Sequence, residues 1–184
     1  MAGFDPTTRA QNLSRLGNEL FDVLVVGGGI TGAGVAREAA LRGLSVALVE
    51  ARDFASGTSS RSSKLIHGGL RYLEQGEIAL VREAATERAV LRRIAPHLTD
   101  TALMLVPVYG RTSAGVYKLR VGLSLFDKLA AVSPGERHRI LSRAEALAAE
   151  PHIAPERLQG AAIYPEYVTD DARLVLDTLK SAHH

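Results

Sequence analysis

The first fifty residues alternate apolar and polar stretches in the order of a strand, a helix and a strand. Residues 21–26 form a nearly continuous apolar run, which is typical of a buried parallel strand, and residues 30–42 place alanine and valine on one helical face. Gly43 supplies a turn into a second apolar run at residues 44–50. The pattern predicts a Rossmann-like βαβ unit of an α/β fold, after a polar leader at residues 1–20.

The pattern after residue 76 predicts one more helix and then, from residue 99, the beginning of an α+β region. A charged amphipathic helix is expected at residues 77–95, where Pro96 ends it. An apolar run at residues 101–109 predicts a strand of another sheet, and Pro107 within it favours an edge position or a bulge, because proline cannot donate to a sheet ladder. The remaining predicted elements are a helix at 116–130, a short helix after the S-x-x-E pattern of Ser142 and Glu145, a strand at 160–164, and a last helix capped by Thr169 or Asp170.

Composition narrows the class of protein. The chain has 184 residues, of which 46% are hydrophobic and 23% charged, as in an ordinary soluble globular protein. A formal net charge of +2 argues against nucleic-acid binding. The absence of cysteine excludes disulfides, thiolate metal sites, thiol catalysis and a cysteinyl flavin. No apolar run reaches the roughly 20 residues of a membrane span, so a cytoplasmic protein is expected. No metal site is expected either.

A glycine pattern joins the first predicted strand to the first helix. Gly27, Gly29 and Gly32 form G-x-G-x-x-G, which permits a tight turn, close approach to a pyrophosphate and close helix–strand packing. Glu50 closes the second strand, where a carboxylate accepts hydrogen bonds from a ribose. The unit predicts dinucleotide binding, and by itself it does not distinguish NAD from FAD.

Residues 58–74, T-S-S-R-S-S-K-L-I-H-G-G-L-R-Y-L-E, form a second block rich in hydroxyls, cations and glycine. We expect Ser59 or Ser60 to cap a short helix that runs through Lys64 and His67. Gly68 and Gly69 would end this helix and would let the backbone approach a planar ring closely. Arg71 is the best candidate to grip an anionic substrate, with the Tyr72 hydroxyl beside it. The alternative is a solvated basic loop in which the serines form turns and His67 is merely hydrogen-bonded.

The sequence resembles the FAD-dependent glycerol-3-phosphate dehydrogenases through three motifs. These are V-V-G-G-G-I-T-G-A-G-V-A at 25–36, F-A-S-G-T-S-S-R-S-S-K-L-I-H-G-G-L-R-Y-L-E at 54–74 and V-T-D-D-A-R-L-V-L at 168–176. The resemblance implies oxidation of sn-glycerol 3-phosphate to dihydroxyacetone phosphate, with hydride passing to flavin N5 and electrons to a quinone, or to oxygen in related oxidases. It implies that Arg71 and Tyr72 contact the substrate, and that the FAD site comprises Gly27, Gly28, Gly29, Thr31, Gly32, Glu50, Thr58, Ser59, Ser63, Lys64 and His67.

Members of that family are much longer, so the resemblance implies an N-terminal portion. We expect a leader at 1–20, a first FAD-binding segment at 21–98, a substrate-binding segment at 99–165 and a helix returning to the FAD-binding domain at 166–184. The general base would then lie beyond residue 184. Two alternatives remain: a related flavoprotein oxidase that uses oxygen, and a non-catalytic remnant that does not hold FAD.

The family is typically peripheral on the inner face of the cell membrane. The apolar stripe of residues 116–130 is bordered by Lys118, Arg120 and Lys128, which would suit anionic lipid. Packing within the protein is favoured for this stripe, because Val121 and Leu125 interrupt the charged face.

Overall fold

A computed structural model describes residues 6–183, apart from the side chains of Pro6, Arg71 and Glu74. The chain divides into two compact units. One contains the residues up to Lys64 together with those from Asp170 onward, and the other is Leu65–Thr169. This division differs from the expected boundary at residue 98, since residues 65–98 pack with the segment that follows them.

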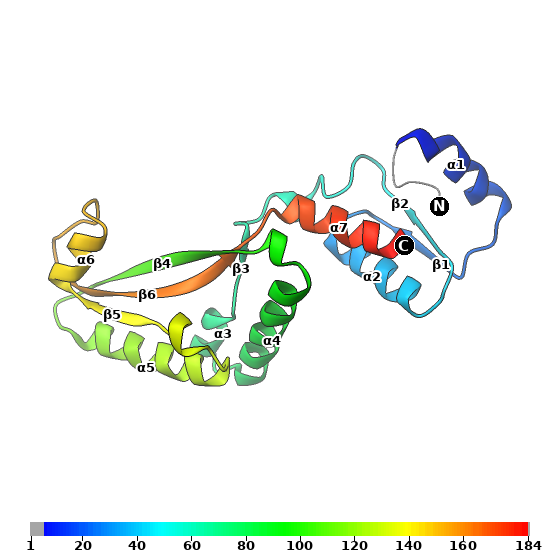
Figure 1. The fold of residues 1–184 in the computed structure, drawn as a ribbon. Helices are drawn as coiled ribbons and strands as arrows, with labels where there is room; N and C mark the ends of the chain where they lie inside the picture. The colour runs from blue at the N-terminus through cyan, green and yellow to red at the C-terminus, as the bar shows by residue number, and fades with distance from the viewer. Residues whose placement is uncertain (1–5, 184) are drawn as a thin grey trace. The chain divides into compact units, whose positions relative to one another are not determined.

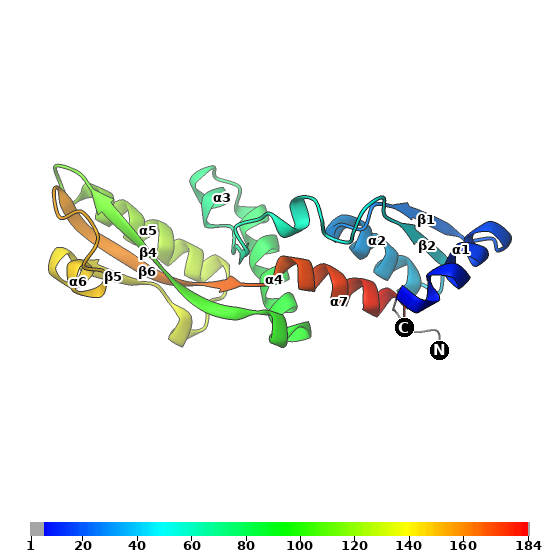
Figure 2. The same ribbon diagram turned by 90° about the horizontal axis from the view of Figure 1, so that it is seen from above.

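The first unit contains the predicted βαβ arrangement. Strand β1 (Val23–Val26) pairs in parallel with β2 (Val46–Val49), and α2 (Ile30–Leu41) connects them. Helix α7 (Asp171–His183) lies beside α2, as Figures 1 and 2 show. The core of the unit lies between these helices and the end of the sheet, and its buried side chains are those of Ala33, Ala55, Val175 and Leu179.

The polar leader contains a helix that the sequence analysis did not predict. Helix α1 (Arg9–Asn18) has no buried residue, and Arg15 and Glu19 form an exposed ion pair at its end. The helix therefore depends on local interactions rather than on packing. The described part of the leader also includes the 3₁₀ turn η1 (Pro6–Thr8).

The second unit is built on an antiparallel sheet with β6 (Leu158–Val168) at its centre. Strand β4 (Asp100–Tyr109) pairs with one edge of β6, while β3 (Leu65–Ile66) and β5 (Arg139–Ser142) pair with it elsewhere. Because β4 has no other neighbour within the described sheet, Pro107 lies on an edge strand, as predicted. The strand expected at 160–164 is longer than predicted and continues through Pro165.

Helix α5 (Ala114–Leu129) lies along one face of this sheet (Figure 1). Leu123 is fully buried and Phe126 is 5% exposed, which confirms that the predicted apolar stripe packs inside the protein. Helix α4 (Ile78–Ile94) buries Val81 and Ala85 and ends just before Pro96, as expected. The remaining elements are α3 (Leu70–Glu74), α6 (Arg143–Ala149), η2 (Thr58–Ser60), η3 (Pro96–Leu98) and η4 (Pro134–Glu136).

Two helix starts follow the predicted capping chemistry. The Ser142 hydroxyl accepts the Glu145 N–H at 3.3 Å, and the Glu145 carboxylate accepts the Ser142 N–H at 2.8 Å. For α7, Asp170 is the cap, because its carboxylate accepts the Arg173 N–H at 3.1 Å. The neighbouring Thr169 hydroxyl is buried without a hydrogen-bond partner in the described structure. No helix within residues 6–183 has the length and apolarity needed to cross a bilayer.

Candidate functional site

The glycine turn between β1 and α2 leaves no room for side chains at two of its positions. A Cβ atom at Gly32 would collide with the carbonyl oxygen of Gly27, and one at Gly28 would lie 2.5 Å from the Phe54 ring. Gly27 itself has φ of +111°, a conformation that favours glycine. Gly28 and Gly32 therefore have to be glycine because other atoms of the protein occupy the space that a side chain would take.

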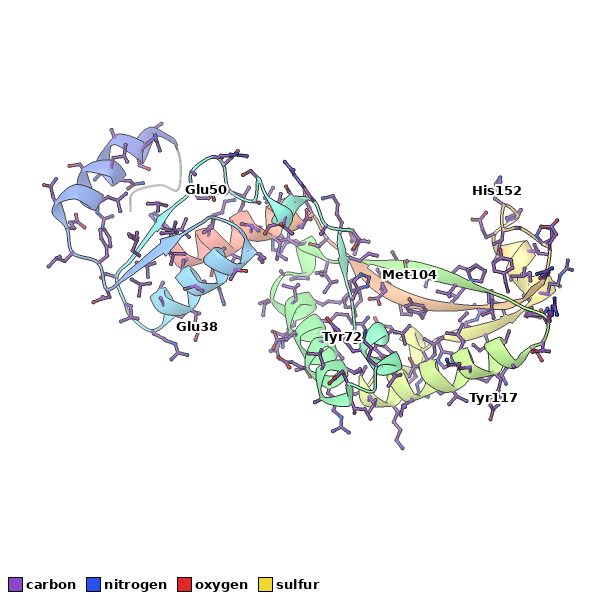
Figure 3. All side chains as sticks on the ribbon, turned by 180° about the vertical axis from the view of Figure 1, so that it is seen from behind. Glu38, Glu50, Tyr72, Met104, Tyr117 and His152 are labelled. Atoms are coloured by element: carbon purple, nitrogen blue, oxygen red, sulfur yellow. The ribbon has the colours of Figure 1, made fainter. Side chains whose placement is uncertain are left out.

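Glu50 follows β2 and is labelled in Figure 3. Its Oε2 accepts the Gly28 N–H at 2.7 Å, and its Oε1 accepts the Arg52 N–H at 2.9 Å. These two backbone donors, Gly28 first, hold the pKa of Glu50 below its ordinary value. Each carboxylate oxygen retains a second lone-pair direction for a ribose hydroxyl. The carboxylate is therefore ionised at neutral pH and also fixes the glycine turn, a role that the sequence analysis did not predict.

Ser59 connects the second sequence block to the glycine turn. Its Oγ accepts the Ile30 N–H at the start of α2 at 3.0 Å, and it lies 3.1 Å from the position that a Cβ at Gly29 would take. Thr31 is exposed in the first helical turn, and Thr58 is exposed at the start of η2. Gly27–Gly32, Glu50 and Ser59 are thus brought together within the first unit.

The short helix expected from Ser59 through Lys64 and His67 is wrong. Only the turn η2 forms, and β3 follows it. Lys64 has φ of +59°, which breaks any helix, and the Ser62 hydroxyl accepts its N–H at 2.9 Å. Leu65 and Ile66 extend because they pair with Val168 and Tyr167 of β6. Ser63 is exposed beside this break.

Lys64 binds a residue that sequence reasoning missed. Its Nζ lies 2.8 Å from Asp171 Oδ1, and the Ser62 hydroxyl donates to Asp171 Oδ2 at 2.7 Å. Hydrogen bonds from Lys64 and then Ser62 lower the pKa of Asp171 to about 2. The carboxylate thereby ties the second sequence block to the start of α7. The sequence predicts only Thr169 or Asp170 as a helix cap, and the adjacent Asp171 was the available signal for this contact.

The Asp171 contact should contribute stability that depends on pH. Because the folded-state pKa lies below the ordinary 3.8, this stability is present above pH 4 and is lost as pH falls towards 2. We expect Asp171→Asn to lower the free energy of unfolding at pH 7 by about 1–2 kcal/mol, allowing for the exposure of Lys64. Urea titrations at pH 7 and pH 2.5 measure the free energy of unfolding, and the difference between the parent protein and Asp171→Asn should shrink at the lower pH. Glu38→Gln, which breaks the exposed pair with Arg42, is the control and should change little at either pH. A loss that is equal at both pH values would contradict the assignment.

The other predicted residues lie in the second unit. The His67 side chain is 60% exposed, with its Nδ1 3.8 Å from Glu166 Oε1. Gly69 has φ of +88° and directly precedes α3, which carries Tyr72 (Figure 3). Tyr72 is 38% exposed. The side chain of Arg71 lies outside the described part of the chain, so its predicted role stays a prediction.

Comparison with known proteins decides the family. Residues 22–184 match the family described as "FAD dependent oxidoreductase". The chain belongs to this family. This membership confirms the expected α/β fold with a parallel βαβ unit and a separate antiparallel sheet, and FAD is the cofactor that gives the family its description.

The most informative relatives are glycerol-3-phosphate dehydrogenases. The chain is 48% identical over 167 residues to the aerobic glycerol-3-phosphate dehydrogenase of Staphylococcus aureus, covering 91% of this chain and 30% of that protein. It resembles the structure of the glycerol-3-phosphate dehydrogenase from Bacillus halodurans complexed with FAD, with a TM-score of 0.70 and 36% identity, covering 96% of this chain and 27% of the other. The expected resemblance is confirmed, and the chain spans about three tenths of the length of the curated relatives it matches.

A more distant likeness concerns the fold alone. The FAD-bound L-alpha-glycerophosphate oxidase of Mycoplasma pneumoniae has a TM-score of 0.66 at 20% identity, covering 90% of this chain and 43% of that chain. The same architecture therefore occurs in dehydrogenases and oxidases.

The residues of the first unit fit the pyrophosphate and ribose of FAD. A Cβ atom at Gly27 would meet no atom within 4 Å and one at Gly29 would meet only the Ser59 hydroxyl, so a phosphate can approach the backbone at these two positions. The N–H of Ile30, the first residue of α2, already donates to Ser59 Oγ, so the next N–H groups of the first turn, together with the helix dipole, are the ones that attract an anion. Glu50 supplies the ionised acceptor at the end of β2.

Proposed function

We propose that this chain is the FAD-binding portion of a glycerol-3-phosphate dehydrogenase that oxidises sn-glycerol 3-phosphate to dihydroxyacetone phosphate. The assembly of the glycine turn, Glu50 and Ser59 in one unit carries the proposal. The 48% identity to an aerobic glycerol-3-phosphate dehydrogenase supports the choice of substrate. Bound FAD would supply a hydride acceptor at flavin N5, and a quinone would reoxidise it.

In this proposal the residues of the chain divide into four roles. Gly27–Gly32 and Thr31 bind the pyrophosphate at the N-terminus of α2, and Glu50 accepts hydrogen bonds from the ribose. Thr58, Ser59, Ser63, Lys64 and His67 are the other residues proposed to bind the cofactor. Arg71 binds the phosphate of the substrate through its guanidinium, with the Tyr72 hydroxyl as a second donor. The base that takes the proton of the substrate hydroxyl is unassigned among these residues.

The proposal is tested by adding sn-glycerol 3-phosphate anaerobically to the FAD-loaded intact protein. The absorbance of oxidised flavin should disappear, and dihydroxyacetone phosphate should form in equal amount. An Arg71→Ala variant should retain its flavin yet require at least about tenfold more substrate for half-maximal reduction, because a charge-assisted contact is lost. Unchanged substrate affinity in that variant would remove Arg71 from the site.

The two alternatives predict different outcomes in the same assay. An oxidase would be reoxidised by oxygen faster than by a quinone analogue, whereas the proposed dehydrogenase should prefer the quinone. A non-catalytic remnant would be colourless after purification and would take up no added FAD. Either result would replace the proposed function.

We also propose that the protein is cytoplasmic and contacts the membrane surface through the exposed face of α5. The buried stripe of that helix is not available for lipid, but Tyr117, Val121 and Leu125 are 70%, 50% and 41% exposed, at a spacing of four residues. Figure 3 shows Tyr117 projecting from this helix. The exposed cations Lys118, Arg120 and Lys128 lie near these exposed apolar side chains, which suits anionic lipid.

A vesicle experiment tests this surface. Leu125→Glu should reduce sedimentation of the intact protein with anionic vesicles by about fivefold or more, because it adds a negative charge and removes apolar contact. Leu80→Glu is the matched control, since Leu80 is 38% exposed on α4 of the same unit. Equal sedimentation of both variants and the parent protein would contradict the assignment.

A further inference from the structure

A buried ion pair lies beneath the glycine pair of the second sequence block. Arg88 of α4 and Glu166 of β6 have side chains only 9% and 4% exposed, and Arg88 Nη1 lies 3.3 Å from Glu166 Oε2. A buried pair loses much of its Coulomb attraction to desolvation, so stability alone is a weak reason for such a pair. Its surroundings suggest another use.

Each member of the pair lies close to one residue of the His67–Gly68–Gly69 turn. A Cβ atom at Gly68 would lie 3.2 Å from both Cζ and Nη1 of Arg88, and 2.7 Å from Cζ of Phe126. The guanidinium and the phenyl ring therefore form a floor directly against the Gly68 backbone. Glu166 Oε1 lies 3.8 Å from His67 Nδ1, which is beyond hydrogen-bond length.

Arg88 is held in place by an aromatic ring. Its Cζ lies 4.9 Å from the centre of the Tyr167 ring, and Arg92 Cζ lies 4.7 Å from the same centre. Arg92 Nη1 donates to the Thr99 carbonyl at 3.0 Å. Tyr167 is in turn paired with Ile66, which directly precedes His67. These contacts restrain Arg88 through stacking as well as through the ion pair, so the floor under Gly68 is rigid.

We propose that Arg88 and Glu166 are positioning residues of the proposed enzyme, which hold the His67–Gly68–Gly69 turn and thereby set the orientation of the His67 ring and the start of α3. The inference rests on the proposed function for its catalytic consequence, because His67 and Tyr72 are the residues expected at the flavin and the substrate. Gly69 at φ of +88° leads directly into the helix that carries Tyr72, and the Tyr72 N–H donates to the Gly69 carbonyl at 2.9 Å. A shift of the turn therefore moves both residues together.

The test separates positioning from stability by removing both charges. Glu166→Gln alone leaves the buried Arg88 without its counter-ion, so the melting temperature of this variant should fall. The double variant Arg88→Met/Glu166→Leu replaces the pair with apolar groups of similar size and should recover most of that melting temperature. If the pair positions the turn, the double variant should still show kcat about 10–100-fold below the parent and an altered absorption spectrum of the bound flavin.

A second measurement does not depend on flavin. Amide hydrogen exchange of residues 67–72 in the intact protein should be about tenfold faster in the double variant, because the floor under Gly68 is gone. The matched control is Asp127→Leu/His138→Met, which removes another largely buried pair of the same unit. In this pair His138 Nδ1 lies 2.7 Å from Asp127 Oδ2, and the side chains are 12% exposed for His138 and 11% for Asp127. It should leave kcat, the flavin spectrum and the exchange of residues 67–72 unchanged.

The outcomes distinguish the two proposals. If the parent protein takes up no FAD, the proposed function fails, and the exchange measurement still judges the positioning role. Unchanged exchange of residues 67–72 in the double variant overturns the inference, as does a flavin-loaded double variant with parental kcat. An equal loss of kcat in the control variant would show a general packing effect and would also overturn it.

Discussion

Replacing Gly32 by alanine should strip FAD from the protein. The added Cβ would collide with the Gly27 carbonyl oxygen and would lie 3.2 Å from Cγ1 of Val25, so α2 must move away from the turn. The Gly27 carbonyl is part of the backbone and cannot rotate aside, and Val25 is buried in the strand beneath. We expect FAD affinity to fall by about 100-fold, equivalent to about 2.8 kcal/mol, and stability to fall by about 1–3 kcal/mol through overpacking. Flavin content after gel filtration and a urea titration measure the two effects.

Gly34 provides the matched control on the same helix. A Cβ at this position meets no atom within 4 Å, so Gly34→Ala should keep its flavin. It should also gain about 0.5–1 kcal/mol of stability, because alanine favours a helix interior. Full flavin content in the Gly32→Ala variant would show that the turn is not the cofactor site.

Leu123→Ala should produce the largest loss of stability in the second unit. Leu123 is completely buried on α5, where the helix packs against the sheet. Truncation removes the transfer free energy of its methyl groups and leaves a cavity, which together cost about 3–5 kcal/mol. Chemical denaturation followed by far-ultraviolet circular dichroism measures the change.

Leu125 is the control for this prediction, two residues away on the same helix. It is 41% exposed, so Leu125→Ala should change the free energy of unfolding by less than about 1 kcal/mol. Similar losses in the two variants would contradict the orientation of α5. That orientation also separates the face that stabilises the sheet from the face proposed to meet lipid.

The first unit was predictable because its signals are local. The apolar runs and the glycine spacing lie within residues 21–50, and each has a physical meaning at its own position. The S-x-x-E pattern at Ser142 was equally local, and both of its hydrogen bonds are present. Glu50 was correctly placed at the end of a strand, but its bond to Gly28 depends on how the turn folds back across 22 residues.

The second sequence block was predicted less well because its structure is set by distant partners. Leu65 and Ile66 carry no strand signal of their own, and they extend only because Val168 and Tyr167 pair with them. Strand β5 likewise depends on β6 for its pairing. The Lys64–Asp171 contact joins residues 107 positions apart, so a basic segment and an acidic pair that looked unrelated in sequence become one feature.

Pro107 has a consequence for how the second unit behaves among other copies of itself. Strand β4 offers a ten-residue edge, and Leu103 on it is 71% exposed, so it could template the addition of a foreign strand. Proline in such an edge interrupts the row of amide donors that an incoming chain would need. Within the described residues, the open side of β4 therefore offers one amide donor fewer to an added strand than its length alone would give.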